Sequence, residues 1–377
     1  MSPLQSLGEP LKVFILGAGS VGSLIAHDLK QHFPKTISPT FLLRPYRSIQ
    51  DYNQITLRRL FDSSSQPRLT VECDAANEST LAPDNDFIEN LIITTKTFQT
   101  EAALKPYVHR LNASSNILIL QNGMGMPRNL INKFWSSSNS ADSRPTFYQA
   151  ITTHGVFKDA QGVVNHASNG ILQISSEQNP INAADKSEPV LEQVAEATHE
   201  TVRLPLLIQL LLETESLSAK FVPYNEFLLL QMEKLVVNCC INPTSALFDV
   251  NNGSLLFGNE ITNIWKSIIT ECVRLFFAEF PVLQDISTAR SFLDEKRLLD
   301  SVISVCRLTS ANSSSMREDV THLRQTEIEN MNGYIAYLGR KHNIPTFTNT
   351  MITSMIKSKL SIDRGIDKAT AESILDV

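Results

Sequence analysis

A glycine-rich turn near the N-terminus constrains the fold of this chain more than any other feature. An apolar run over Lys12–Leu16 leads directly to Gly17, and Gly19 and Gly22 complete a GxGxxG spacing. A helical pattern of apolar residues begins at Val21. Strand, glycine turn and helix in this order form the cradle in which a dinucleotide places its diphosphate against the helix N-terminus. The motif therefore predicts a dinucleotide-binding domain at the start of the chain.

Arg44 predicts which dinucleotide binds. It follows an apolar strand pattern over Thr40–Leu43 and lies 22 residues after Gly22. Proteins specific for NAD place Asp or Glu roughly 20 residues past the glycines, where the carboxylate binds the ribose 2′-hydroxyl. A guanidinium at this place can instead bind a 2′-phosphate, and Arg47 adds a second cation nearby. We therefore expect NADPH/NADP as the cofactor; the alternative is that Arg44 is a solvated loop residue.

Two further polar residues follow predicted strands. Lys96 comes after the strand expected over residues 90–95, and Asn122 comes after the strand expected over residues 116–121. Ligands of open α/β sheets bind beyond the carboxyl ends of the strands, so both residues are candidates. The alternatives are that Lys96 neighbours a helix cap and that Asn122 belongs to a turn. The candidate cofactor-binding residues are Gly17, Ala18, Gly19, Ser20, Val21, Gly22, Arg44, Lys96 and Asn122.

The chain changes character near residue 192. Before it, strands alternate with short helices and residues 146–176 are strand-like, which is typical of a parallel sheet covered by helices. After it, helical periodicities dominate. We expect an α/β Rossmann-type domain over residues 1–205, an all-α domain over residues 206–377, and a ligand cleft between them. The main helices of the second domain are expected over residues 226–241, 259–280, 297–307 and 315–342.

Composition limits the classes of partner and site. The net charge of −6 argues against nucleic acid as the main partner, and the longest aliphatic stretch is too short to span a bilayer. Residues 1–10 lack the features of a secretory signal and the five cysteines form no CxxC pair, which favours the cytoplasm. The eight histidines show no HxxxH spacing, so no metal site is expected. We interpret His154 as a packed or loop histidine and not as a metal ligand, and Arg58–Arg59 as a solvated pair.

A second informative segment places three polar residues on one face of a predicted helix. Lys234, Asn238 and Asn242 follow one another at intervals of four residues among apolar neighbours. A buried polar face must be satisfied by protein, water or ligand, so the alternative to a site is an internal hydrogen-bond network between helices. Beside a nicotinamide cofactor, a partly buried lysine can protonate the oxygen of a ketone that accepts hydride. Lys234 is therefore the candidate general acid.

A third segment, Asn312–Glu329, combines small polar residues with a helix start. Ser315 is expected to cap a helix, with Glu318 completing a capping box. The same helix start could instead bind a substrate carboxylate. Glu327 lies 12 residues after Ser315, which on a continuous helix is about 120° around the axis, so the two need not share a face.

Taken together, these segments resemble the ketopantoate reductase (2-dehydropantoate 2-reductase) family, in a longer, fungal-like form. The resemblance covers most of the chain and implies a Rossmann domain that binds NADPH and a helical domain that closes over the substrate. It implies reduction of 2-dehydropantoate to (R)-pantoate, a step toward pantothenate and coenzyme A. The matching motifs are GAGSVG at residues 17–22, TTK at Thr94–Lys96, QNGMG at Gln121–Gly125, TTHG at Thr152–Gly155, KLVVNCCINP at Lys234–Pro243 and NSSSMREDVTHLRQTEIENMNG at Asn312–Gly333.

The resemblance also implies roles for individual residues. Lys234 resembles the general acid of the family, and Glu327 resembles the carboxylate that holds the substrate hydroxyl and organises the site. Arg44 matches the arginine with which the family binds the NADP phosphate. The substrate-binding residues implied by the resemblance are Asn122, Lys234, Asn238, Asn242, Asn312, Ser315 and Glu327.

Some alternatives stay open at this point. The substrate could be another branched 2-keto acid, since the hydride chemistry would be the same. The chain could also be a catalytically inactive relative that acts as a binding or regulatory protein. We expect a monomer or homodimer. The extra length relative to a compact bacterial pattern is expected around residues 136–144, 179–217 and 280–296, away from the motifs.

Overall fold

The computed structural model describes residues 10–61, 68–81, 87–136, 143–176 and 204–375 of the 377-residue chain. Backbone contacts group the chain into two compact units. The first comprises Met1–Gln121 and Gly125–Phe227, and the second comprises Asn122–Met124 and Leu228–Val377. Two of the segments expected to hold extra length, residues 136–144 and 179–217, fall largely outside the described residues.

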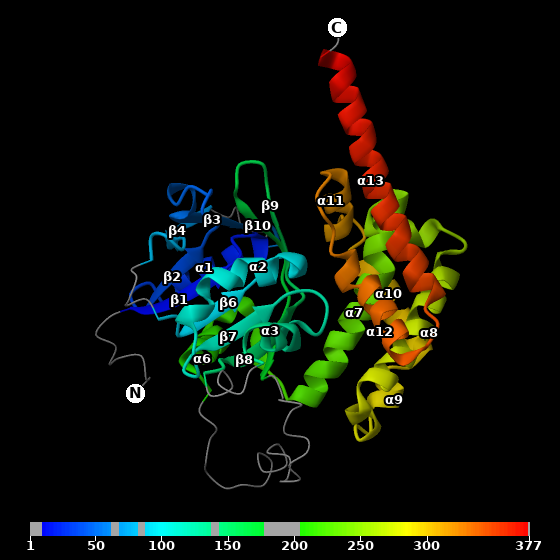
Figure 1. The fold of residues 1–377 in the computed structure, drawn as a ribbon, viewed down its shortest axis with the longest axis horizontal. Helices are drawn as coiled ribbons and strands as arrows, with labels where there is room; N and C mark the ends of the chain where they lie inside the picture. Colours follow the sequence, from blue (N-terminus) through cyan, green and yellow to red (C-terminus); the bar gives the residue numbers. More distant parts are fainter. Residues whose placement is uncertain (1–9, 62–67, 82–86, 137–142, 177–203, 376–377) are drawn as a thin grey trace. The chain divides into compact units, whose positions relative to one another are not determined.

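An eight-stranded sheet forms the centre of the first unit, with the order β12-β11-β8-β7-β6-β1-β2-β5 (Figure 1). The six strands from β8 to β5 are parallel, and β11 is antiparallel to β8. In register, Leu16 at the end of β1 pairs with Leu42 of β2 and Ile93 of β6. The residues that follow these three strands therefore meet at one edge of the sheet. The strands are β1 (Leu11–Leu16), β2 (Ile37–Leu42), β5 (Asp74–Ala76), β6 (Asn90–Ile93), β7 (Asn116–Leu120), β8 (Thr146–Thr152), β11 (Leu172–Ser176) and β12 (Ala219–Phe221).

Helices cover both faces of this sheet because its strands are apolar on both sides. Along β1, Val13 and Ile15 pack into the core that also contains α1 and α6, whereas Phe14 and Leu16 pack into the core that contains α2 and α3. Each fully buried side chain of this size contributes roughly 1.5–3 kcal/mol. The helices are α1 (Ser20–His32), α2 (Thr100–Leu104), α3 (Met126–Phe134) and α6 (Leu206–Glu213), with the short 3₁₀ helices η2 (Gln50–Tyr52), η3 (Thr97–Gln99), η4 (Lys105–Arg110) and η6 (Glu215–Leu217).

A second, four-stranded sheet with the order β4-β3-β10-β9 packs against α1, so that this helix lies between two sheets (Figure 1). The strand pattern expected over residues 146–176 is confirmed, whereas β3, β4 and β5 were not predicted. The strands of this sheet are β3 (Gln54–Arg59), β4 (Leu69–Glu72), β9 (Gly155–Lys158) and β10 (Val164–Ser168).

A buried polar network joins α1 to the second sheet. The Asp28 carboxylate on α1 accepts a 2.7 Å hydrogen bond from Arg59 of β3, and the Arg59 guanidinium also lies 2.7 Å from His166 Nδ1. The prediction that Arg59 belongs to a solvated pair is therefore wrong, although Arg58 is exposed. His154 is packed, as expected, with Nδ1 3.0 Å from His166 Nε2. Burial, together with the charges of His154 and Arg59, lowers the pKa of His166 to about 4, so this imidazole is neutral at physiological pH.

Burial opposes the ionisation of Asp28, but hydrogen bonds from His27, Arg59 and Ser216 and the charge of Arg59 outweigh it. The pKa of the Asp28 carboxyl is therefore lowered.

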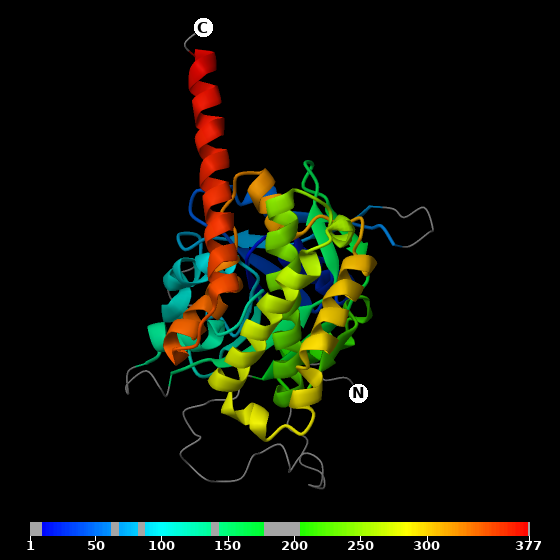
Figure 2. The same ribbon diagram turned by 90° about the vertical axis from the view of Figure 1, so that its right-hand side faces the viewer.

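The second unit is helical. Figure 2 shows α8 and α10 side by side, and α12 packs against both α8 and α13. The C-terminal part of α13 extends beyond the other helices of the unit (Figures 1 and 2). None of the described helices combines the length and hydropathy that a membrane span requires. The helices are α7 (Tyr224–Phe248), α8 (Ile261–Glu279), α9 (Ala289–Phe292), α10 (Glu295–Leu308), α11 (Ser315–Thr321), α12 (Asn332–His342) and α13 (Phe347–Leu375), with the 3₁₀ helices η7 (Asn252–Phe257), η8 (Pro281–Gln284) and η9 (Ile328–Asn330).

Helix α7 continues through Pro243, beyond the end expected at residue 241. A proline inside a helix leaves the carbonyl four residues earlier without its usual N–H donor, here that of Cys239. The Asn332 side chain of α12 donates to this carbonyl oxygen at 3.0 Å, and Trp265 Nε1 of α8 donates to the next one, of Cys240, at 3.1 Å. A neighbouring helix therefore satisfies the carbonyl that the proline leaves without a donor.

The helix expected over residues 315–342 is wrong as a single element. The first part, α11, ends at Thr321, and Leu323 then adopts a left-handed backbone with φ of +53°. The chain closes this turn with a 2.7 Å hydrogen bond from Arg324 N to Asp319 O, and α12 begins only at Asn332. Glu327 therefore lies in the connection between two helices, directly before η9, and the estimate of its angle around one helix does not apply. Helix α13 was not predicted.

The division expected at residues 205 and 206 stays a prediction about domain organisation. Helix α6 follows that point, yet Leu207, Ile208 and Leu211 are fully buried in the core of the first unit with α1. The two compact units change over at Phe227 and Leu228, inside α7.

Candidate active site

The glycine turn has the local geometry that a phosphate cradle needs. Gly17 has φ of +125°, which side chains rarely tolerate, and a methyl group there would lie 2.6 Å from Thr94 Oγ1. The Thr94 hydroxyl donates to Gly17 O at 2.7 Å, so the end of β6 supports the turn. A methyl group at Gly22 would lie 2.1 Å from Gly17 O. Both glycines are therefore required by the protein's own packing.

The protein's own packing does not require Gly19, because a methyl group there would meet no atom of the described residues within 4 Å. It precedes α1 in an extended conformation, and no side chain caps the helix. The first backbone N–H groups of a helix have no partner within it, so the start of α1 at Ser20 and Val21 offers donors beside open space. This arrangement fits the diphosphate of a dinucleotide. Ala18, the remaining residue of the turn, is half-buried.

Arg44 lies two residues past the end of β2, at the sheet edge where Gly17 follows β1. Its guanidinium donates to the Tyr46 hydroxyl at 2.8 Å, and that of Arg47 donates to the Tyr52 hydroxyl at 2.6 Å. The hydrogen bond from Arg44 lowers the pKa of Tyr46. In the described part of the chain, neither arginine is paired with a carboxylate, and both are exposed. Both guanidinium groups can therefore bind an anion.

Lys96 directly precedes η3, after β6 has ended at Ile93. The Gln121 side chain, directly after β7, donates to Thr95 Oγ1 at 3.1 Å, two residues past the end of β6, and so ties the ends of the two neighbouring strands together. Lys96 is half-buried beside this tie. The structure thus places Lys96 at the same sheet edge as the glycine turn.

The second unit places Lys234 in the middle of α7, where it is half-buried. Burial lowers the pKa of its ammonium from 10.5 to about 8, while the negative charge of Glu327 acts in the opposite direction. The group is therefore charged at neutral pH yet releases its proton readily, which suits a general acid.

Glu327 and Asn122 lie together beside α7. The Glu327 side chain is only 5% exposed, and its Oε2 accepts a 3.4 Å hydrogen bond from Asn122 Nδ2. Gly123 packs so closely on η9 that a methyl group there would lie 2.7 Å from Asn330 O. Gln231 of α7 donates to Gly123 O at 3.4 Å. The structure therefore brings Lys234, Glu327 and Asn122 together. Gln231, which lies three residues before Lys234 on the same helix, was not predicted as a member of this group.

Asn238 and Asn242 lie on α7 after Lys234, the first half-buried and the second buried. Asn242 Nδ2 lies 3.7 Å from the sulfur of Met331, a weak acceptor. The buried amide therefore retains most of its capacity to bind a polar ligand. The internal network that the sequence left open also exists, but it is centred on Asn332, which donates to Asn349 Oδ1 at 2.9 Å.

The predicted cap at Ser315 is wrong. Ser314 caps α11 by accepting a 3.1 Å hydrogen bond from Arg317 N, and its hydroxyl lies 2.7 Å from that of Ser245 on α7. Because Ser314 is buried against α7, it takes the capping position, and Ser315 becomes the first helical residue with an exposed side chain. Asn312 is also exposed, while its backbone oxygen accepts from Asn252 N at 3.0 Å.

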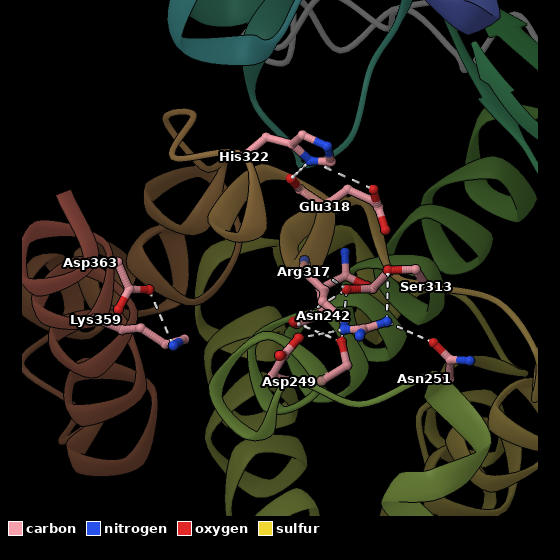
Figure 3. A network of polar contacts seen from close by, with 11 residues as sticks. Asn242, Asp249, Asn251, Ser313, Arg317, Glu318, His322, Lys359 and Asp363 are labelled. Carbon is pink, nitrogen blue, oxygen red and sulfur yellow. Dashed lines mark hydrogen bonds and ion pairs between the residues drawn. The ribbon is translucent and has the colours of Figure 1, made fainter. Parts of the chain in front are cut away.

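Arg317 holds this segment in place and was not predicted. Figure 3 shows its guanidinium between Asp249 and Asn251, with Nε 2.9 Å from Asp249 Oδ1 and a terminal nitrogen 2.7 Å from Asn251 Oδ1. Asp249 and Asn251 belong to the connection that follows α7. Arg317 therefore ties the start of α11, with Asn312 and Ser315 beside it, to the end of the helix that carries Lys234.

Known families account for most of this chain. Family models match over residues 13–179, described as ketopantoate reductase PanE/ApbA, and over residues 226–360, described as ketopantoate reductase PanE/ApbA C terminal. A relative from Schizosaccharomyces pombe, named probable 2-dehydropantoate 2-reductase, is 36% identical and covers 93% of this chain and 97% of its own. The chain belongs to the ketopantoate reductase family. The 2-dehydropantoate 2-reductase of Saccharomyces cerevisiae is 28% identical, over 93% of this chain and 95% of its own.

Solved structures agree with this family fold. The crystal structure of probable 2-dehydropantoate 2-reductase panE from Bacillus subtilis matches with a TM-score of 0.62 at 24% identity, covering 93% of this chain and all of that one. D-mandelate dehydrogenase in a ternary complex with NADH and anilino(oxo)acetate matches with a TM-score of 0.72 at 20% identity, covering 93% of this chain and 98% of that one. At these identities the structures support the fold alone, an α/β Rossmann-type unit followed by a helical unit.

Proposed function

We propose that this chain reduces 2-dehydropantoate to (R)-pantoate with NADPH, with Lys234 as the proton donor. The observation that carries the proposal is the half-buried Lys234, with a pKa lowered to about 8, beside the buried Glu327 and the half-buried Asn122. The S. pombe and S. cerevisiae relatives, both named for this reaction and aligned over nearly their whole length, support the choice of substrate. The reaction is a step toward pantothenate and coenzyme A.

The first unit carries most of the proposed cofactor-binding residues. The open face at Gly19 and the start of α1 would hold the diphosphate, and Arg44 would pair with a 2′-phosphate. Lys96 is proposed to contribute from the end of β6, and Asn122, which belongs to the second unit, is proposed to contribute as well. When bound, NADPH supplies the hydride.

The second unit supplies the proton. As the carbonyl carbon of the substrate is reduced, negative charge develops on its oxygen, which the Lys234 ammonium stabilises and protonates. Glu327 keeps Lys234 charged, because its carboxylate raises the pKa that burial lowers. Glu327 is also proposed to accept a hydrogen bond from the substrate hydroxyl.

Four further residues are proposed to hold the substrate. Asn238 and Asn242 present amides from the same helix as Lys234. Asn312 and the exposed Ser315 lie at the start of α11, where a helix N-terminus favours a carboxylate.

Because all five cysteines are free thiols, a reducing compartment is suitable, and we propose the cytoplasm.

The experiment that tests the proposal is NADPH oxidation by the pure protein with a panel of 2-keto acids. 2-Dehydropantoate should give the highest kcat/KM, and NADPH should be preferred over NADH. Arg44→Ala should raise the KM for NADPH about tenfold through loss of one charge-assisted pair, with little change for NADH. Equal kcat/KM for both cofactors in the wild type would contradict the cofactor assignment. A 2-keto acid with a higher kcat/KM than 2-dehydropantoate would contradict the substrate assignment.

A further inference from the structure

Lys158 of the first unit is a charged residue at a strand position that faces the protein core. It is the last residue of β9, and side chains two apart along a strand share a face. Val156 on that face packs against the core around α1, whereas the intervening Phe157 is 48% exposed on the other face. Lys158 therefore belongs to the face of the second sheet that covers α1, and it is half-buried.

The Lys158 ammonium reaches the glycine turn. Nζ donates to the backbone oxygen of Ala18 at 2.8 Å, across 140 residues of sequence. An ammonium has three N–H donors, and in the described part of the chain this bond is its sole hydrogen bond. Two donors are therefore left for a ligand, beside the turn whose next residue is the open Gly19.

The charges around Lys158 favour the binding of an anion beside it. No carboxylate of the described residues pairs with it, and the groups that act on it electrostatically are Arg47 and the thiol of Cys73. Burial, followed by the charge of Arg47, lowers the pKa of the Lys158 ammonium. A half-buried cation beside a second cation is unfavourable unless an anion joins them.

We propose that Lys158 binds a phosphate group of the dinucleotide cofactor, reaching the glycine turn from β9. This inference rests on the proposed function, because it requires a dinucleotide in the turn. The phosphate can be the 2′-phosphate, shared with Arg44 and Arg47, or the diphosphate over Gly19. The competing role is purely structural: Lys158 would only support the carbonyl of Ala18.

The test is the Kd of NADPH and of NADH, from fluorescence titration of wild type, Lys158→Gln and Lys158→Arg. Glutamine keeps a hydrogen-bond donor but removes the charge, and arginine keeps the charge. Lys35→Gln is the matched control, because Lys35 is exposed and lies beyond the opposite end of α1. Melting temperatures of all four proteins report on the fold.

We expect Lys158→Gln to weaken NADPH binding about 10- to 100-fold, the loss typical of a charge-assisted hydrogen bond, and to reduce the dependence of Kd on salt. Lys158→Arg should recover most of the affinity, and Lys35→Gln should bind as the wild type does. Loss for NADPH alone identifies the 2′-phosphate, and equal loss for NADH identifies the diphosphate.

Two results would overturn the inference while leaving the proposed function intact. One is unchanged binding of both cofactors by Lys158→Gln. The other is an equal loss in the glutamine and arginine variants with the salt dependence unchanged, which would make Lys158 a structural support. If the wild type binds neither cofactor, the proposed function fails and the inference fails with it.

Discussion

The glycine turn and the cluster of Lys234, Glu327 and Asn122 are formed in opposite ways. The turn is formed by backbone geometry within one short segment, and its glycines matter through the side chains they lack. The cluster is formed by side chains from three distant segments, with Asn122, Lys234 and Glu327 held by a loop, a helix and a connection between helices. The comparison teaches that a turn able to fit a diphosphate can be set by a local motif, whereas bringing a lysine beside a buried carboxylate needs the tertiary fold of the second unit.

The largest effect should come from the cluster. Lys234→Ala should lower kcat by roughly 10²–10⁴, the range for loss of a general acid, while the Kd of NADPH stays near that of the wild type. Alanine favours helix, so the melting temperature should not fall sharply. Steady-state kinetics, cofactor titration and a melting curve on one sample separate these effects. A kcat close to that of the wild type would make Lys234 a structural residue.

The turn should respond differently at its two positions. Gly17→Ala forces an unfavourable backbone and a clash with Thr94, so it should destabilise the protein by about 1–3 kcal/mol as well as weaken cofactor binding. Gly19→Ala meets no protein atom, so it should leave stability unchanged and still weaken NADPH binding. Chemical denaturation and cofactor titration of both variants check this contrast. If Gly19→Ala binds NADPH normally, the diphosphate does not approach that face.

Glu327→Ala should have a smaller and substrate-dependent effect. The loss for 2-dehydropantoate should be about 1–3 kcal/mol in kcat/KM, because its hydroxyl loses a buried partner. A 2-keto acid without that hydroxyl should lose less. The assay belongs well below pH 8, because the loss of the carboxylate lowers the Lys234 pKa further and the comparison should not depend on this change. An equal loss for both substrates would assign Glu327 a structural role.

The two regions also differ in how far the sequence could predict them. The turn, Arg44 and the strand ends follow from local pattern, because parallel strands bring their carboxyl ends to one edge. The cap of α11 could not be assigned among adjacent serines, because Ser314 is selected by its contact with Ser245. The end of α11 near Leu323 likewise depends on a left-handed backbone conformation, which the residue types there do not predict.

Long-range polar contacts were hardest to predict. Arg317 contacts residues 66 and 68 positions away, and Lys158 contacts Ala18 across 140 positions. Nothing in the surrounding sequence distinguishes such cations from solvated ones. The same reason explains why Arg59 was misinterpreted as a surface residue.

The pH dependence of kcat/KM for 2-dehydropantoate, at saturating NADPH, tests the central claim most directly. A proton donor acts only in its protonated form, so the rate should be level below pH 8 and fall about tenfold per unit above the Lys234 pKa of about 8. In Glu327→Gln the fall should begin at lower pH, because the carboxylate that raises this pKa is gone. A profile that stays level to pH 10, or a fall that Glu327→Gln does not move, would contradict the assignment of Lys234 as the donor.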